Sequence, residues 1–425
     1  MNDVLVIGAG LSGLTAAYTV AQTGLKAKVI AKGLGSLHWG AGTIDLFGYA
    51  PLDPQRPIAR PLDFIAGWLA ENQPQHPYAL LGARQVQAAL DSFAALTSDM
   101  GLPYIGAQTS GDNLLLPTAV GAARPTFLAP QSQLAGDLSR DEPMLIVGFA
   151  GLRDFYPHLV AENLGKAGQR ARAALLPFDL LTDRNDSNTV QQAQGMDDPA
   201  RRGKLAAAIK KIVQPGERVG LPPILGLEAP TKAWADVQQQ VGAPVFEIPT
   251  LPPSVPGMRL YMALRDRLRQ MGVRVEIGLE ARGAATRNGH IEWVETATTA
   301  RPLKHSAQQF VLATGGIMGG GFDSDHTGRV WEVIFDLPLT TPQQRSKWFR
   351  PAFINPDGHP VYTGGVLTDA RMQPLEGAGN LVYDNLWAVG DLLANDNPIL
   401  QRSLEGAALA TGYAAGLRIA QMSRK

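Results

Sequence analysis

Residues 4–13 read VLVIGAGLSG, an apolar run that leads into the spacing Gly-x-Gly-x-x-Gly. The run predicts a short buried strand of a parallel sheet, and the residues from Leu14 to Gln22 predict a helix after the turn. In such a turn Gly8 permits the sharp bend, Gly10 lets a pyrophosphate approach the backbone, and Gly13 lets the helix pack closely on the strand. The helix N-terminus offers free N–H groups to phosphate oxygens. This stretch therefore predicts a dinucleotide-binding turn.

The second strand of this unit, residues 28–31, ends at Lys32. In many dinucleotide-binding folds an acidic residue about 20 positions after the turn accepts hydrogen bonds from a ribose. Lys32 cannot accept such a bond, so it either contacts a phosphate or faces solvent. The missing acid argues against an ordinary FAD or NAD site.

Two later segments favour a flavin. Residues 311–316 (VLATGG) form a buried strand that ends in small residues, so that the turn at Thr314 and Gly315 can pass over the cofactor near its phosphates. Residues 389–391 (VGD) end another strand, where Gly390 allows close approach and Asp391 can accept hydrogen bonds from a ribityl chain. The three motifs resemble, in this order, those of flavoproteins of the fumarate reductase and glutathione reductase type.

Two further segments are expected to contact the flavin. Residues 36–46 (SLHWGAGTIDL) supply small residues that can wrap the ring or a phosphate. Ser403 is a candidate N-cap of the last helix, residues 404–422, whose positive end can stabilise charge on a reduced flavin. The predicted cofactor contacts are Gly8, Gly10, Leu11, Ser12, Gly13, Lys32, Ser36, Gly40, Gly42, Thr314, Gly315, Gly390, Asp391, Ser403 and Leu404.

No catalytic acid or base can be assigned from the residues. His38 is a candidate acid, base or flavin contact, although an isolated histidine is more often structural. Arg402 is a candidate for substrate or flavin contact, and its alternative is an ordinary surface arginine. The remaining histidines show no spacing typical of metal ligands, so no metal site is predicted.

Composition restricts the function further. The 425 residues contain 38 Lys and Arg against 38 Asp and Glu, so no net field favours nucleic acid or anionic lipid. The absence of cysteine excludes disulfides, thiolate catalysis and cysteine-held iron–sulfur clusters in this chain. No apolar window approaches the roughly 18 residues expected of a transmembrane helix.

The order of strand and helix patterns predicts an α/β protein: a Rossmann-like FAD/NAD(P)-binding flavoprotein fold with an inserted parallel α/β domain. The flavin-binding domain is expected to be discontinuous, over residues 1–50 and 255–425, with a small cap-like segment at about 320–365. Residues 51–141 are expected to be irregular or helical. Alternating strands and helices place the inserted domain at 142–254, with an exposed loop over residues 183–199.

Several segments resemble the B subunit of the anaerobic glycerol-3-phosphate dehydrogenase. They are residues 8–13, 36–46, 76–82 (HPYALLG), 151–155 (GLRDF) and 250–260 (TLPPSVPGMRL). The resemblance spans nearly the whole chain, and residues 250–260 are its most specific part. Lys32 agrees with this family, which has a basic residue there. The Cys/Gly-rich stretch of the family near the C-terminus corresponds to residues 401–408, which lack cysteine.

The resemblance implies a subunit of a complex that oxidises glycerol 3-phosphate to dihydroxyacetone phosphate and passes electrons to quinone. It implies FMN as the cofactor, whereas the glycine turn suits the pyrophosphate of FAD. The implied partners are an FAD-containing dehydrogenase subunit and an iron–sulfur subunit that anchors the complex to the inner face of the cell membrane, leaving this chain cytoplasmic and peripheral. Two alternatives stay open: a freestanding oxidoreductase of the fumarate reductase type, and a non-catalytic electron-transfer or docking subunit.

Overall fold

The computed structural model describes residues 2–50, 53–109, 111–180, 187–298, 301–377 and 379–423. The chain divides into two compact units. Unit 1 comprises residues 1–36, 45–93 and 264–425, and unit 2 comprises residues 37–44 and 94–263. The domain boundaries drawn from the sequence stay a prediction, and each unit is described by itself.

A five-stranded sheet forms the centre of unit 1, in the order β13-β2-β1-β17-β20. Every neighbouring pair is parallel, so the carboxyl ends of the strands lie at one edge. The register places Val4 beside Ala27 on one side and Gln309 on the other, and Val4, Leu5 and Val6 at the centre of β1 are fully buried. The strands are β1 (Asn2–Ile7), β2 (Ala27–Ala31), β13 (Arg274–Ile277), β17 (Ala307–Leu312) and β20 (Leu386–Ala388). The predicted α/β fold is confirmed.

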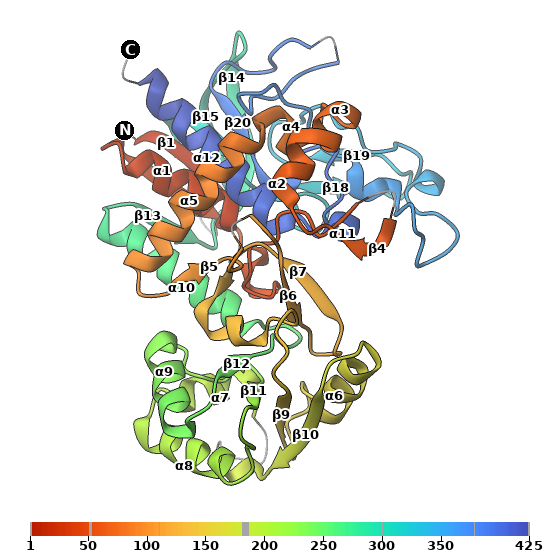
Figure 1. Cartoon of the computed structure of the whole chain (residues 1–425). Helices are drawn as coiled ribbons and strands as arrows, with labels where there is room; N and C mark the ends of the chain where they lie inside the picture. Colours follow the sequence, from red (N-terminus) through yellow and green to blue (C-terminus); the bar gives the residue numbers. More distant parts are fainter. Residues whose placement is uncertain are drawn as a thin grey trace. The chain divides into compact units, whose positions relative to one another are not determined.

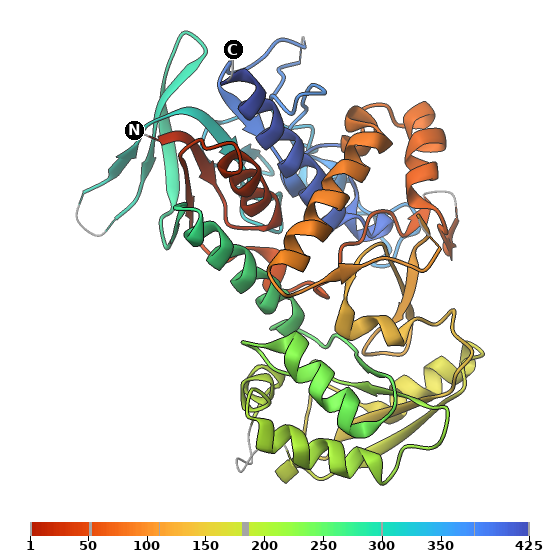
Figure 2. The same ribbon diagram turned by 60° about the vertical axis from the view of Figure 1, so that its left-hand side comes forward.

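Two helices pack against each other beside this sheet. Helices α1 (Leu11–Ala21) and α12 (Leu404–Met422) lie side by side (Figure 2) and contact each other along their lengths. Small residues allow the close approach: a Cβ atom on Gly412 would lie 2.3 Å from the Ser12 carbonyl oxygen. The predicted first helix begins three residues earlier than expected, because Gly13 lies inside it rather than before it.

A β-hairpin extends from unit 1 at β14 (Ala281–Arg287) and β15 (His290–Thr296), and β16 (Leu303–His305) completes its sheet (Figure 2). Its turn residues Asn288 and Gly289 have φ angles of 50° and 74°, which is the conformation expected from the Asn-Gly signal. Shorter elements complete this unit: β3 (Tyr49–Ala50), β4 (Asp53–Pro57), α2 (Pro61–Phe64), α3 (Ala70–Asn72), α4 (Pro77–Leu81), β18 (Phe322–Ser324), β19 (Val330–Glu332) and α11 (Pro398–Gln401).

Unit 2 contains a second parallel sheet, in the order β10-β9-β11-β12. From β9 the chain moves to β10 on one side of it, and from β10 it crosses back over β9 to β11 on the other side. Because parallel crossovers are right-handed, this reversal of direction places the connecting helices on opposite faces of the sheet. Figure 1 shows α6 on the other side of these strands from α8 and α9. The elements are β9 (Met144–Phe149), α6 (Pro157–Lys166), β10 (Ala171–Leu176), α7 (Thr189–Gly195), α8 (Pro199–Lys210), β11 (Arg218–Leu221), α9 (Pro230–Val241) and β12 (Val245–Glu247).

The rest of unit 2 is built from short pairs of strands. These are β5 (Tyr104–Ile105) with β8 (Ala129–Pro130), and β6 (Leu114–Pro117) with β7 (Ala123–Thr126). Two long helices have residues in both units: α5 (Ala83–Asp99) and α10 (Val255–Gln270). Among the helices of the described residues, none is long and apolar enough to cross a bilayer.

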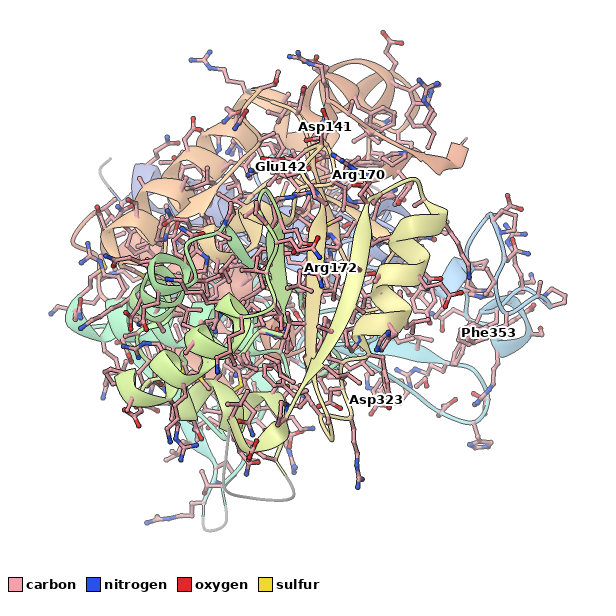
Figure 3. The ribbon with its side chains drawn as sticks, turned by 60° about the horizontal axis from the view of Figure 1, so that its bottom comes forward. Asp141, Glu142, Arg170, Arg172, Asp323 and Phe353 are labelled. Carbon is pink, nitrogen blue, oxygen red and sulfur yellow. The ribbon has the colours of Figure 1, made fainter. Side chains whose placement is uncertain are left out.

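Ionic groups stabilise unit 2 at two places. Asp141, Glu142 and Arg170 gather where β9 and β10 begin (Figure 3), and Arg172 on β10 forms a two-pronged ion pair with Glu217 at 2.6 and 2.7 Å. Glu247 and Arg259 form a buried pair, with both guanidinium nitrogens within 3.0 Å of the carboxylate. Hydrogen bonds from the Ser132 hydroxyl and the Leu225 N–H to Glu247 complete its coordination, as a buried carboxylate requires.

The expected loop over residues 183–199 is wrong in part, since α7 occupies residues 189–195. The Asn188 side chain accepts a hydrogen bond from the Gln191 N–H, and the Gln191 side chain accepts one from the Asn188 N–H. This capping box satisfies two donors at the start of a helix. Residues 183–186 of the expected loop lie outside the described residues.

Candidate functional site

The glycine turn between β1 and α1 is shaped by backbone packing. Gly8 has a φ angle of +122°, and a Cβ atom there would lie 2.1 Å from the Ala313 carbonyl oxygen. A Cβ atom on Gly13 would lie 2.1 Å from the carbonyl oxygen of Gly8. A Cβ atom on Gly10, in contrast, would meet nothing within 4 Å. Gly8 and Gly13 are thus required by the fold, whereas the open face of Gly10 is where a phosphate can approach the backbone.

Helix α1 presents its N-terminus at this turn. The helix begins at Leu11, and its N-cap residue Gly10 has no side chain to bond the first N–H groups. These donors, at Leu11, Ser12 and Gly13, carry the partial positive charge of the helix dipole. The residues therefore fit the pyrophosphate of a dinucleotide.

The carboxyl ends of β17 and β20 bring the other two motifs to the same sheet edge as the turn. Thr314 follows β17, and its hydroxyl oxygen is buried with no hydrogen-bond partner among the described residues. The Gly316 N–H donates to the Asp391 carboxylate at 3.3 Å. An unsatisfied buried hydroxyl beside the glycine turn is the kind of group that a bound ligand satisfies.

Gly390 fixes the position of Asp391. Its φ angle is +79°, and a Cβ atom there would lie 2.6 Å from the Ser12 hydroxyl oxygen. The Gly390 N–H donates to the Thr411 hydroxyl on α12 at 2.9 Å. The residue is therefore held between the first turn of α1 and the last helix, and this places Asp391 beside the glycine turn.

The carboxyl group of Asp391 has an unusual proton affinity. Burial of the group and the nearby negative charge of Asp396 raise its pKa to about 7, against the smaller opposing effect of the Gly316 N–H. At neutral pH the group is thus divided between its protonated and ionised forms. In either form it can accept a hydrogen bond from a sugar hydroxyl.

Lys32 forms an ion pair with Glu280 at 2.7 Å, and its side chain is 78% exposed. The sequence left open whether Lys32 contacts a phosphate or faces solvent, and its role as a phosphate contact stays a prediction. Ser36 lies in the same unit and is exposed.

Three predicted site residues of the segment after β2 lie in unit 2: His38, Gly40 and Gly42. Gly42 has a φ angle of +71°, and a Cβ atom there would lie 2.4 Å from the Pro256 ring. His38 packs against the Tyr261 ring at 4.9 Å between centroids, and burial lowers its pKa. Its Nδ1 atom is buried without a partner among the described residues. Their roles as cofactor or catalytic residues stay predictions.

Helix α12 begins at Leu404, so Ser403 occupies the N-cap position that the sequence predicts. Its hydroxyl, however, makes no capping bond and donates instead to the Asp396 carboxylate at 2.8 Å. In the first turn of α12, the Gly406 N–H donates to the Asp45 carbonyl oxygen at 3.0 Å. Arg402, the preceding residue, is exposed and has a φ angle of +52°.

A buried polar cluster at this helix start was not predicted from the sequence. His76 Nε2 lies 3.0 Å from Gln401 Oε1 and 3.4 Å from Asp396 Oδ1, and Tyr78 donates its hydroxyl to the Ser403 carbonyl at 3.2 Å. The only local signal was His76 before Pro77, because His76 caps α4 through its Nδ1 atom. The partners lie about 320 residues further along the chain, at Asp396, Gln401 and Ser403.

The arrangement of a glycine turn, a helix N-terminus and two further strand ends agrees with comparisons to known proteins. Residues 3–401 match the FAD_binding_2 family, described as an FAD binding domain. A protein of Halobacterium salinarum, named as the probable B subunit of an anaerobic glycerol-3-phosphate dehydrogenase, is 33% identical over 99% of this chain and 98% of its own length. The chain belongs to this B-subunit family.

A second relative confirms the extent of the match. The B subunit of the anaerobic glycerol-3-phosphate dehydrogenase of Yersinia pseudotuberculosis is 32% identical over 96% of both chains. Among solved structures, the 3-ketosteroid Δ1-dehydrogenase of Sterolibacterium denitrificans covers 99% of both chains with a TM-score of 0.48 and 12% identity. Membership of the B-subunit family rests on the two sequence matches.

Proposed function

We propose that this chain is the flavin-carrying subunit of a complex that oxidises glycerol 3-phosphate. The observation that carries the proposal is the full-length similarity to the B-subunit proteins, at 33% identity over 99% of the chain. The glycine turn and the free N-terminus of α1 support it independently, because they suit a cofactor with a pyrophosphate. The bound flavin supplies the redox chemistry, and the protein supplies its position and its electrostatic environment.

FAD is the flavin that the residues favour. FMN has a single phosphate, whereas Gly10 and the first turn of α1 offer an open backbone face and several N–H donors. The family model that matches residues 3–401 is an FAD binding domain. We propose that Asp391 holds the ribityl chain and that the positive end of α12 stabilises charge on the flavin ring.

The identity of the flavin is tested by acid extraction of the purified protein, followed by chromatography of the released cofactor. We expect FAD in a ratio approaching one per chain. FMN would overturn the assignment of the pyrophosphate to the glycine turn. Nicotinamide without flavin would overturn the function itself.

We propose that turnover needs partner subunits, because the relatives are named as one subunit of a larger enzyme. The chain contains no cysteine, so iron–sulfur clusters for onward transfer to a quinone must lie on another chain. The complex is proposed to contain an FAD-containing dehydrogenase subunit and a cluster-bearing subunit that attaches it to the membrane.

Anaerobic absorption spectroscopy distinguishes a subunit that needs its partners for turnover from an autonomous enzyme. The flavin of the purified chain is expected to stay oxidised after glycerol 3-phosphate is added, and to bleach once the partner subunits are present. Bleaching of the isolated chain would instead establish a freestanding oxidoreductase. Copurification with a cysteine-rich protein would support the complex.

A further inference from the structure

A cavity of about 370 Å³ lies within unit 1, beside the start of α12. This volume is in the range of small-molecule sites, about 300–1,000 Å³. Its walls come from four parts of the chain: Tyr49 on β3, the approach to α4 at residues 73–76, residues between 356 and 363, and the segment from Asn395 to Gln401. We call it the amide-lined pocket, because its polar residues include Gln73, Gln75, Asn395, Asn397 and Gln401.

Hydrogen bonds between the walls hold the pocket in shape. The Asn395 side chain donates to the Gln75 carbonyl at 3.3 Å, and the Asn395 N–H donates to the Thr363 carbonyl at 3.0 Å. The Gly48 N–H donates to the Gln401 carbonyl at 2.7 Å. A pocket whose walls are already joined loses little conformational freedom when it binds a ligand.

Two buried carboxamides in the pocket have donors to spare. Asn397 and Gln401 are each 5% exposed, and each uses its carbonyl oxygen within the protein: Asn397 accepts from the Leu400 N–H, and Gln401 accepts from His76. Among the described residues, neither side-chain nitrogen has a hydrogen-bond partner. Neither nitrogen is one of the fully buried atoms that lack a partner, so both can bond solvent in the pocket, and a ligand that displaces this solvent has to offer oxygen lone pairs to replace those bonds.

The charges around the pocket disfavour an anionic ligand. Its lining contains the acid Asp357 and neither lysine nor arginine. Asp396 does not line the pocket, but its Oδ1 atom lies 3.4 Å from Nε2 of the lining residue His76. The Nδ1 atom of His76 accepts a hydrogen bond from the Tyr78 N–H at 3.1 Å. Arg350 bonds the Gly358 carbonyl and is not a lining residue.

We propose that the amide-lined pocket binds an uncharged polyhydroxy compound and rejects phosphorylated forms of it. Donors without partners exclude a purely cationic ligand, which has no lone pairs to offer, and the acidic surroundings exclude an anion. Hydroxyl groups satisfy both kinds of neighbour, since they accept from the amides and donate to Asp357 or to the pocket's hydroxyl and carbonyl oxygens. The inference goes beyond the proposed function and holds whether or not this chain reduces its flavin.

Three ligands with the same three-carbon skeleton test the proposal on the full chain with its flavin bound. They are glycerol, glycerol 3-phosphate and 2-amino-1,3-propanediol, which carries a positive charge at neutral pH. Binding is followed by saturation-transfer NMR and titration calorimetry. We expect glycerol to bind, and glycerol 3-phosphate to bind at least about tenfold more weakly in the isolated chain.

Isosteric variants locate the binding. Asn397→Asp and Gln401→Glu keep the oxygen that the protein uses and replace the spare NH₂ donor with a charged oxygen. Each should weaken glycerol binding about tenfold, as loss of a buried hydrogen bond does. Gln270→Glu makes the same change on the exposed end of α10 and should leave binding unchanged. Gln73→Ala, in the less buried part of the wall, keeps the test valid if a buried variant fails to fold.

Other outcomes overturn the proposal. Tighter binding of glycerol 3-phosphate that both isosteric variants abolish would make the pocket a phosphate site. Tighter binding of the amine, strengthened by Asn397→Asp, would make it a cation site. Absence of glycerol binding, or binding that none of the pocket variants changes, would show that the pocket has no such ligand. Each result leaves the flavin content of the chain, and so the proposed function, separately measurable.

Discussion

At the scale of single residues, the glycines of the first turn have separable roles. Gly8 and Gly13 have neighbours at 2.1 Å from an added Cβ atom, whereas Gly10 has none within 4 Å. The sequence motif predicts all three without telling these roles apart. The structure does so because the steric demand at Gly8 comes from Ala313, which is about three hundred residues away in the chain, and that at Gly13 comes from the carbonyl oxygen of Gly8.

Replacing Gly10 with alanine therefore tests the cofactor site without disturbing the fold. Gly10→Ala should lose most of its flavin and keep the thermal stability of the flavin-free protein, because the methyl group occupies the face where a phosphate approaches the backbone and meets no protein atom. Flavin absorbance per chain and the melting temperature are the measurements. Gly33→Ala, also with nothing within 4 Å, is the matched control and should retain flavin. Full flavin content in Gly10→Ala would show that the phosphates bind elsewhere.

The carboxyl group of Asp391 leads to a prediction about how the stability of the protein depends on pH. Its folded-state pKa of about 7 exceeds the ordinary value of 3.8, so the folded protein retains a proton that the unfolded chain releases. The free energy of unfolding therefore falls as the pH rises from about 4 to about 7, through this group. The Asp391→Asn variant lacks this titrating group. The difference between its free energy of unfolding and that of the unmodified protein should therefore rise from about pH 4 to about pH 7 and then level off.

Urea unfolding at a series of pH values measures this difference. The control is Asp323→Asn, because Asp323 is an exposed acid on β18 (Figure 3) and should give a difference that does not follow this curve. If the Asp391→Asn and unmodified curves run parallel between about pH 4 and pH 8, the carboxyl group is not perturbed as described.

At the scale of elements, the sequence predicted the strands, turns and helices whose signals lie within a few neighbouring residues. The strand, turn and helix of residues 4–22, the Asn288-Gly289 hairpin and the last helix all carry signals within a few residues. Helix α7 was missed although its capping box at Asn188 and Gln191 was readable. The sheet order could not be predicted, because it depends on distant strand pairings such as Val4 with Gln309. The pocket could not be predicted either, because it depends on contacts such as that of His76 with Gln401, 325 residues apart.

The contact between α1 and α12 yields a prediction about packing. Gly412→Ala should lower the free energy of unfolding by about 1–3 kcal/mol, because the new methyl group meets the Ser12 carbonyl oxygen at 2.3 Å and the two helices must separate. This outweighs the gain in helix propensity of up to about 1 kcal/mol. Chemical denaturation measures the change.

The matched control is Gly203→Ala in the interior of α8, where the nearest atom to a new Cβ lies 3.6 Å away. In that variant the higher helix propensity of alanine should slightly raise the free energy of unfolding. A stabilised Gly412→Ala would mean that α1 and α12 do not pack this closely.

At the scale of the whole molecule, each unit has a parallel sheet and a buried core of its own. Chains with two such units often unfold in more than one step. Whether the units are thermodynamically independent matters for function, because predicted cofactor residues lie in both of them: Gly8 and Asp391 in unit 1, and Gly40 and Gly42 in unit 2. If flavin contacts both, its binding should couple two otherwise separate transitions.

Scanning calorimetry of flavin-free and flavin-bound protein tests this coupling with two variants. Glu247→Gln weakens the buried ion pair with Arg259 in unit 2, a change that costs up to about 3–5 kcal/mol where a buried partner is lost. Without flavin, it should lower one transition and Gly412→Ala the other. With flavin bound, each variant should shift both. Separate transitions that persist with flavin would confine the cofactor to unit 1, and a single transition without flavin would show that the units already unfold together.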